Sequence, residues 1–510
     1  NKIPKRISNM NKSILNSAVM AAIAISITAC SSGGGSDVAG IGGSGITSSG
    51  TITGFGSVYV NGVKYDTSSA TISIDDNPGI ESDLSVGMRV TVSGSLIDDS
   101  NGTATSISFN DDLEGPVSNI QPLPYDTTRT MTVLGRQVVI DSTTTSFDIS
   151  GTLPGPFDFD SIVDGNLVEI SGFLDSNGVM KATRVELKAT NFNHNNNTVE
   201  MKGTVENFNF PSFNIANTTG VTVDVSSAVI DDNLPGGIVD GAFVEVKGTC
   251  SSATCSTVNA SKVESGFDDF SDNDDVEVEG IITSLTDQNN FEVNGIPVDA
   301  SGATRIPASL NLVEDREVEV EGTIVNGTLV ATKVKDESND LKVEATISSV
   351  TPSTSSFELT PVSGQPAITV VIDKSTEVDD NVGSITNPDD LITGLNSGDF
   401  VSVEGYDGGS GTVVASEVER DAVDDVIVQG IITAGSTASG TVTILGVTIP
   451  FDGATEFEDA NDLPFADADE FFTAIANGSG IGSTLVKVKD RADNSKNPAG
   501  IADEIEIELP

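Results

Sequence analysis

The supply of histidine and cysteine sets the first limit on the chemistry of this chain. It holds one histidine, His194, in the asparagine-rich segment 191–197, and three cysteines, Cys30, Cys250 and Cys255. A serine or cysteine nucleophile usually needs a histidine base, and the common zinc sites need several histidine or cysteine ligands. Carboxylates are so numerous that no pair stands out as a glycosidase-type acid pair. We therefore predict no catalytic residues and expect a protein that is not an enzyme, with a hydrolase the least favoured class.

Acidic clusters are the candidate metal sites. The densest one occupies residues 268–275, and smaller ones lie at 75–77, 111–114, 231–233, 336–340, 379–381 and 421–425. Ca²⁺ takes six to eight oxygen ligands, which a junction between two domains can supply jointly. No cluster has the order of an EF-hand loop, and a solvated acidic linker would have the same composition. The candidate calcium ligands are Asp268, Asp269, Asp272, Asp274 and Asp275; no other cofactor is predicted.

The N-terminal segment has the pattern of an export signal. Four basic residues within 2–12 precede an apolar run at 14–27, which is too short for a stable membrane span. The run ends in Ile27-Thr28-Ala29-Cys30, which resembles the lipobox of bacterial lipoproteins. The resemblance implies that residues 1–29 are a signal peptide and that Cys30 carries the lipid. The residue after the cysteine is Ser31, which resembles the residue type found there in lipoproteins that are sorted to the outer membrane. The alternative is an ordinary cleaved signal with an incidental cysteine.

The remaining two cysteines flank four residues of what the sequence predicts to be a hairpin tip. In an exported chain, Cys250 and Cys255 at such a tip favour a local disulfide. A redox-active pair would usually be more closely spaced, at the start of a helix.

One short sequence unit recurs along the rest of the chain. After a Gly/Ser-rich segment at 30–49, predicted to be a flexible tether, come six copies, which we call units 1 to 6. They occupy residues 50–112, 114–189, 199–266, 276–337, 342–421 and 426–509. Repetition at this spacing is typical of an array of small domains.

The sequence of each unit predicts five strands. Asn61-Gly62 and Asn294-Gly295 mark the hairpin of strands two and three, because both turn residues need positive φ. The fourth strand is bounded by glycines, and the fifth carries Ala-x-x-Val or Ala-x-x-Ile. Short helices are predicted at 388–392 and 467–477, between the third and fourth strands. We therefore predict an all-β chain of six small five-stranded barrels of the OB type; small two-sheet sandwiches are the alternative.

An aspartate ends the third strand of every unit. Its side chain can accept hydrogen bonds from nearby backbone amides, so we predict a turn role in preference to a ligand role. The six positions are Asp66, Asp141, Asp224, Asp299, Asp373 and Asp452.

The Gly-x-Ile lead-in, the Val-Asn-Gly hairpin, the Gly-x-x-Val-x-Val-x-Gly strand and the Ala-x-x-Val ending together resemble a bacterial family known as domain of unknown function 5666. The resemblance covers almost all of the chain from residue 50. It implies a secreted or lipoprotein setting and carries no catalytic residues.

The formal net charge of −51 limits the partners. Such a chain repels nucleic acid and anionic membrane surfaces, so we expect the membrane to be reached only through the lipid. The expected function is a non-catalytic surface binding or spacer module in the bacterial outer membrane, with a glycan or a protein as ligand. The alternative is a periplasm-facing component that docks a protein partner by strand addition at exposed sheet edges.

Overall fold

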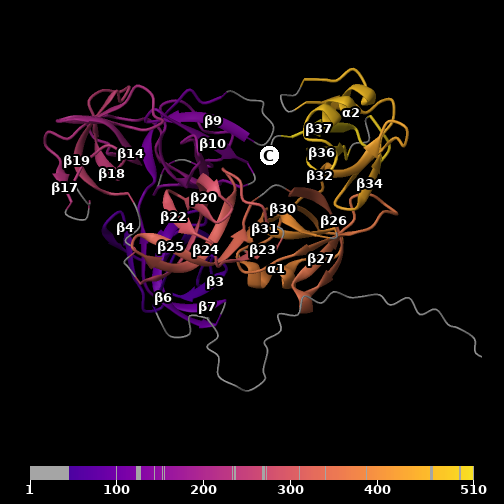
Figure 1. The fold of residues 1–510 in the computed structure, drawn as a ribbon, viewed down its shortest axis with the longest axis horizontal. Helices are drawn as coiled ribbons and strands as arrows, with labels where there is room; N and C mark the ends of the chain where they lie inside the picture. The colour runs from indigo at the N-terminus through magenta and orange to yellow at the C-terminus, as the bar shows by residue number, and fades with distance from the viewer. Residues whose placement is uncertain are drawn as a thin grey trace, which may run out of the picture. The chain divides into compact units, whose positions relative to one another are not determined.

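The computed structural model describes residues 45–508, except 99, 122–127, 143, 152, 154, 232–233, 235–236, 267–269, 271–272, 309, 339–340, 386, 410, 460–462 and 493–495. Almost all regular structure in this part of the chain is β-strand (Figure 1). Cys30, the predicted signal peptide and most of the predicted tether lie outside the described residues. None of the described helices is both long and apolar enough to cross a membrane.

Five strands of unit 1 close into a ring. The order is β1 (Gly45–Gly54), β2 (Val58–Val60), β3 (Val63–Asp66), β7 (Asn101–Phe109) and β6 (Arg89–Asp98), and β6 pairs with β1 again. The β3–β7 pairing is parallel and the other four are antiparallel. This is the strand order of an OB-type barrel, so the predicted fold class is confirmed and the sandwich alternative is wrong.

The same ring recurs in units 2 to 5. In ring order, unit 2 has β8 (Leu113–Ser118), β9 (Thr128–Val133), β10 (Arg136–Asp141), β13 (Met180–Ala189) and β12 (Leu167–Leu174), and unit 3 has β14 (Val199–Asn209), β15 (Ser212–Ile215), β16 (Thr222–Asp224), β19 (Thr257–Ser265) and β18 (Phe243–Cys250). Unit 4 has β20 (Asp275–Asp287), β21 (Asn290–Val293), β22 (Ile296–Asp299), β25 (Thr328–Asp336) and β24 (Glu317–Val325). Unit 5 has β26 (Leu341–Thr351), β27 (Ser356–Leu359), β28 (Ile368–Val371), β31 (Thr412–Asp421) and β30 (Phe400–Gly409).

Unit 6 is incomplete by comparison. It contains β32 (Val426–Ser436), β33 (Thr441–Ile444), β34 (Val447–Pro450), β36 (Leu485–Asp490) and β37 (Glu504–Ile507). Within the described residues β34 pairs with β33 but forms no ladder with β37. One backbone hydrogen bond, from Ala502 N to Pro450 O at 2.9 Å, spans that side of the ring.

A further short strand in every unit pairs in parallel with the fifth barrel strand, which the sequence did not predict. These strands are β4 (Thr71–Ile74), β11 (Ser146–Ile149), β17 (Val229–Ile230), β23 (Thr304–Ile306), β29 (Glu377–Asp380) and β35 (Glu456–Glu458). In unit 1, β5 (Asn77–Gly79) extends β4 as a hairpin, and η1 (Glu81–Asp83) follows. In unit 5, η2 (Pro352–Thr354) connects β26 and β27. These strands have two to four residues, too few for an alternating pattern to stand out.

Both predicted helices are confirmed. In α1 (Pro388–Gly394) the side chain of Asn387 caps the first turn, accepting from Asp390 N at 3.0 Å. In α2 (Ala468–Asn477) Asp467 accepts from Glu470 N at 3.1 Å. Phe471 and Ile475 face the core, as their spacing of four predicts.

Local backbone chemistry agrees with the sequence motifs. Asn294 and Gly295 have φ values of 50° and 79°, as a type I′ turn requires. Five of the six recurring aspartates accept a hydrogen bond from the backbone N–H two residues later, at 2.8–3.0 Å, which confirms their turn role. The pairs are Asp66–Ser68, Asp224–Ser226, Asp299–Ser301, Asp373–Ser375 and Asp452–Ala454.

The second glycine of the fourth-strand motif lies inside the observed strand, which continues beyond it, and faces the alanine of the Ala-x-x-Val motif. At this point the register shifts, and a Cβ on the glycine would lie 2.0–2.4 Å from the carbonyl oxygen before the alanine. This close approach explains why both motifs recur together. The pairs are Gly94–Ala104, Gly172–Ala182, Gly248–Ala260, Gly322–Ala331 and Gly405–Ala415.

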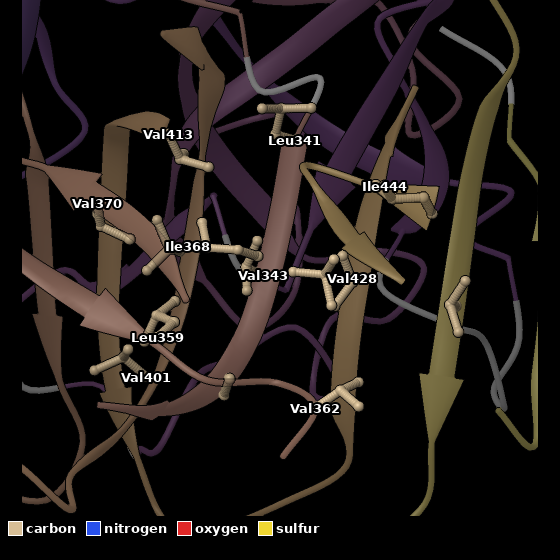
Figure 2. Packing of buried hydrophobic residues seen from close by; sticks show 14 of the residues in the cluster. Leu341, Val343, Leu359, Val362, Ile368, Val370, Val401, Val413, Val428 and Ile444 are labelled. Carbon is tan, nitrogen blue, oxygen red and sulfur yellow. The ribbon is translucent and has the colours of Figure 1, made fainter. Parts of the chain in front are cut away.

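The barrels share sheets in pairs. Units 2 and 3 pair through β8 and β14, and units 5 and 6 through β26 and β32, both antiparallel. Val343 lies opposite Val428 in this ladder, and one apolar core continues from unit 5 into unit 6 (Figure 2). Units 1 and 4 pair in parallel through β1 and β20.

This last pairing corrects the predicted end of the tether. Residues 45–49 belong to β1, although their Gly/Ser composition is that of a linker. Ser48 is fully buried, and its hydroxyl donates to Glu277 on β20 at 2.8 Å. A small polar side chain is needed here because two strands meet, and composition alone does not reveal that.

Candidate functional site

The predicted site residues fall into three groups. Cys250 and Cys255 form a disulfide with their Cα atoms 4.8 Å apart. Of the candidate calcium ligands, Asp268, Asp269 and Asp272 lie outside the described residues. Asp275 accepts from the Thr323 hydroxyl at 2.8 Å, and Asp274 precedes it. Calcium binding at this cluster therefore stays a prediction. His194 is partly exposed in the connection between units 2 and 3.

A cavity of about 240 Å³ brings together residues from units 1 to 4. Three cations line it, namely Arg89, Arg136 and Lys202. The chain has only 25 lysines and arginines against 76 acidic residues, so three cations around one small cavity are an unusual concentration. Phe173 and Phe243 supply apolar wall.

Two of these cations are matched by a carboxylate. Arg89 donates to Asp112 at 2.9 Å, and Lys202 donates to the same Oδ1 at 3.1 Å. Burial opposes the charge of Asp112, but Arg89 and Lys202 hold its pKa below the usual value. The Arg89 guanidinium also lies 4.7 Å from the centre of the Phe173 ring, within the range of a cation–π contact.

Arg136 has no such match. Its side chain is 1% exposed, and its Nη atoms donate to two backbone carbonyls, Gly178 O at 2.7 Å and Lys202 O at 3.1 Å. The buried Nε has no hydrogen-bond partner in the described structure. Burial lowers the pKa of the guanidinium to about 10, with Asp175 opposing that shift. The group is therefore charged at neutral pH, and no carboxylate of the described residues forms an ion pair with it.

The sequence holds a signal for Arg136. This arginine directly follows Leu134-Gly135, the unit 2 version of the hairpin turn. The residue after the turn glycine is Val63 in unit 1, Ile296 in unit 4 and Val447 in unit 6. Val63 and Val447 are buried, so unit 2 places an arginine where the barrel normally buries an aliphatic side chain. Gly203 leaves room for it, because a Cβ there would lie 2.8 Å from Arg136 Nη2.

In a second buried cluster the cation makes three ion pairs, although its Nε, like that of Arg136, has no hydrogen-bond partner in the described structure. Arg184 on β13 is 1% exposed and contacts Glu169 at 3.0 Å, Glu186 at 3.0 Å and Asp148 at 3.3 Å. Burial opposes the charge of Arg184, but Glu169 and Glu186 raise its pKa. Every strong interaction of this guanidinium is made within unit 2, which indicates a structural role.

A larger cavity, of about 880 Å³, is lined by many carboxylates and by three cations, Lys181, Arg316 and Lys342. Burial raises the pKa of Glu317, Glu337 and Glu377 to about 8. Burial thus disfavours the ionised form of these three acids. No pair among them is distinguished as an acid and a base.

Comparison with known proteins gives one family. Five segments match the description "Domain of unknown function (DUF5666)", at residues 46–108, 114–186, 265–335, 344–419 and 429–479. Unit 3 lies between the second and third segments, yet its ring has the same strand order. No curated protein matches the chain.

Proposed function

Because the chain belongs to the DUF5666 family, whose description gives no function, we propose one from the geometry: a non-catalytic binding protein of the cell envelope, held by an N-terminal lipid. Its ligand carries a small anionic group, such as the carboxylate of a uronic acid in a glycan. The cavity around Arg136 is the binding site.

The observation that carries this proposal is the unmatched buried charge of Arg136. Burying a cation without a counter-ion costs several kcal/mol in free energy of unfolding, so a chain that needed only a stable barrel would gain from an aliphatic residue there. A carboxylate that entered the cavity would supply the counter-charge and accept from Nε. The size of the cavity suits one sugar residue or a similar small group and not a polymer as a whole.

The arrangement of units favours binding over a spacer role. A spacer gains length when each domain contacts only its neighbours in the chain. Here unit 1 pairs with unit 4, and the anion-binding cavity draws its walls from four units. The repetition thus supports a composite site and gives little added reach.

Strand addition, the alternative function, has limited room. Closed rings leave no free edge for a partner strand. Among the described residues, unit 6 is the place where a barrel strand, β34, has one ladder partner. Among the barrel strands, docking by strand addition is therefore confined to that unit, while short strands outside the rings, such as β11 and β17, also have one ladder partner each. We rank strand addition second.

The binding proposal is tested with glucuronate, galacturonate and glucose as probes. Isothermal titration of the full chain is expected to detect the two uronates and not glucose. Arg136→Met is expected to weaken uronate binding at least about tenfold, since a hydrogen bond to a charged group contributes about 1.5–3 kcal/mol to binding.

The matched control is Arg305→Met. Arg305 also donates to neutral oxygens, Gln288 Oε1 at 3.0 Å and Leu310 O at 3.1 Å, but it does not line this cavity. This variant should bind uronate like the wild type. Equal binding of glucose and uronates, or full binding by Arg136→Met, would remove the proposal.

The lipid anchor is a separate prediction. Cys30→Ser is expected to leave unprocessed precursor or to release the protein from membranes, because only Cys30 offers the modified thiol in the lipobox-like segment. Metabolic labelling with a fatty-acid analogue and membrane fractionation measure both effects. If the variant is processed and fractionates like the wild type, Cys30 is not the anchor.

A further inference from the structure

Three carboxylates from separate parts of the chain meet outside the anion-binding cavity. Asp75 follows β4 of unit 1, Asp111 lies between β7 and β8, and Glu200 lies on β14 of unit 3. One oxygen from each is within 4.8 Å of the others. Two oxygens on opposite sides of a Ca²⁺ ion at about 2.4 Å lie about 4.8 Å apart, so this spacing fits a shared ion.

Asp111 gives an independent indication of a ligand. Its side chain is 1% exposed, and its Oδ1 has no hydrogen-bond partner in the described structure. The next residue, Asp112, is equally deep but is bound by Arg89, Lys202 and the backbone N–H of Gly172. Of these two adjacent acids, Asp112 is therefore satisfied within the protein and Asp111 Oδ1 is not. A buried carboxylate oxygen without a donor lowers the stability of the fold, so its presence calls for an explanation.

The surrounding charges do not neutralise the cluster. In the part of the chain described, the salt bridge that reaches it is from Lys247 to Glu200, at 3.4 Å, and Lys247 also serves Glu245 at 3.3 Å and Asp76 at 3.7 Å. Burial and then the neighbouring carboxylates Glu169, Asp75, Glu200 and Glu114 raise the pKa of Asp111 well above its usual value. Burial and Glu245 raise that of Glu200 to about 10, with Lys247 and Lys202 opposing. Burial and the neighbouring carboxylates thus disfavour the ionised form of both acids, and a bound cation would oppose that effect.

We propose that Asp75, Asp111 and Glu200 bind a calcium ion that ties units 1 and 3 together. All three ligands are carboxylate oxygens, which suits a hard cation and excludes the soft metals that prefer sulfur or imidazole. The site is distinct from the cluster at 268–275 and does not depend on the anion-binding cavity.

Calcium chloride titrated into the metal-free full chain tests the proposal. The wild type is expected to bind calcium with release of protons, because Asp111 and Glu200 must ionise to become ligands. Its melting temperature should rise by about 2 °C or more at saturating calcium. Asp111→Asn is expected to lose the proton release and the thermal shift, while its calcium-free melting temperature stays equal to or above that of the wild type.

Two further variants separate this site from other acids. Asp379→Asn changes the first acid of the same Asp-Asp-Asn sequence in unit 5 and should respond to calcium like the wild type. Asp272→Ala with Asp274→Ala removes ligands of the other cluster and should keep the proton release. A wild type without calcium response at millimolar concentration, or an Asp111→Asn variant with a full response, would overturn the proposal. The same shift with magnesium at equal concentration would overturn the choice of calcium.

Discussion

Arg184→Ala is expected to lower the free energy of unfolding by about 3–5 kcal/mol, the cost of breaking a buried ion pair by removing one partner. Glu169, 2% exposed, would keep only Lys188 as a cationic partner. Burial already raises the pKa of Glu186, and Arg184 is among the groups that counter that shift. Its removal therefore raises this pKa further.

The deficit of this variant should depend on pH. The folded variant would hold protons that the unfolded chain has lost at neutral pH, so its stability falls as pH rises above about 4.5. The deficit is thus expected to be smaller near pH 5 than near pH 8. Urea unfolding at both pH values, with hydrogen exchange of β12 and β13 as a local readout, measures it.

Arg491→Ala is the matched control. Arg491 is 35% exposed and pairs with Glu504 at 2.9 Å, and such pairs contribute about 0–1 kcal/mol to the free energy of unfolding. A loss of similar size in the two variants would show that burial does not set the energy of the Arg184 cluster.

Gly322→Ala is expected to destabilise unit 4 by about 1–3 kcal/mol, the usual range for overpacking. The new Cβ would lie 2.2 Å from Val330 O and 2.9 Å from the Cα of Ala331. Both are backbone atoms, so relief requires β24 and β25 to separate at the register shift. Faster amide exchange along these two strands is the local measurement.

Gly302→Ala serves as the control within the same unit. A Cβ at Gly302 meets nothing within 4 Å, so the substitution should leave stability unchanged or raise it slightly by restricting the unfolded chain. Unchanged exchange in Gly322→Ala would mean that the strand pair tolerates the extra carbon and that the Gly–Ala motif has another cause.

The barrel itself could be predicted because each signal is local. Asn294-Gly295 specifies its turn through φ, the Phe471–Ile475 spacing specifies the buried side of a helix, and the glycine-bounded strands specify where two backbones touch. The pairing of β1 with β20 could not be predicted, because alternation shows which face of a strand is buried and not which strand lies at its edge. The cavity around Arg136 could not be predicted for the same reason. Arg136, Asp112 and Phe173 come together only through contacts between units.

The β1–β20 pairing also bears on how the protein is made. Ser48 and its partner Glu277 are 229 residues apart, and ribosomes add about 5–20 residues per second. The outer edge of β1 must therefore wait about 10–50 s for its partner after it leaves the ribosome. Units 2 and 3 can join during that time, since their pairing strands are closer in the chain. The first barrel therefore completes its contact with unit 4 well after units 2 and 3 can have joined, and its newly made edge is the place where a chaperone would have to act.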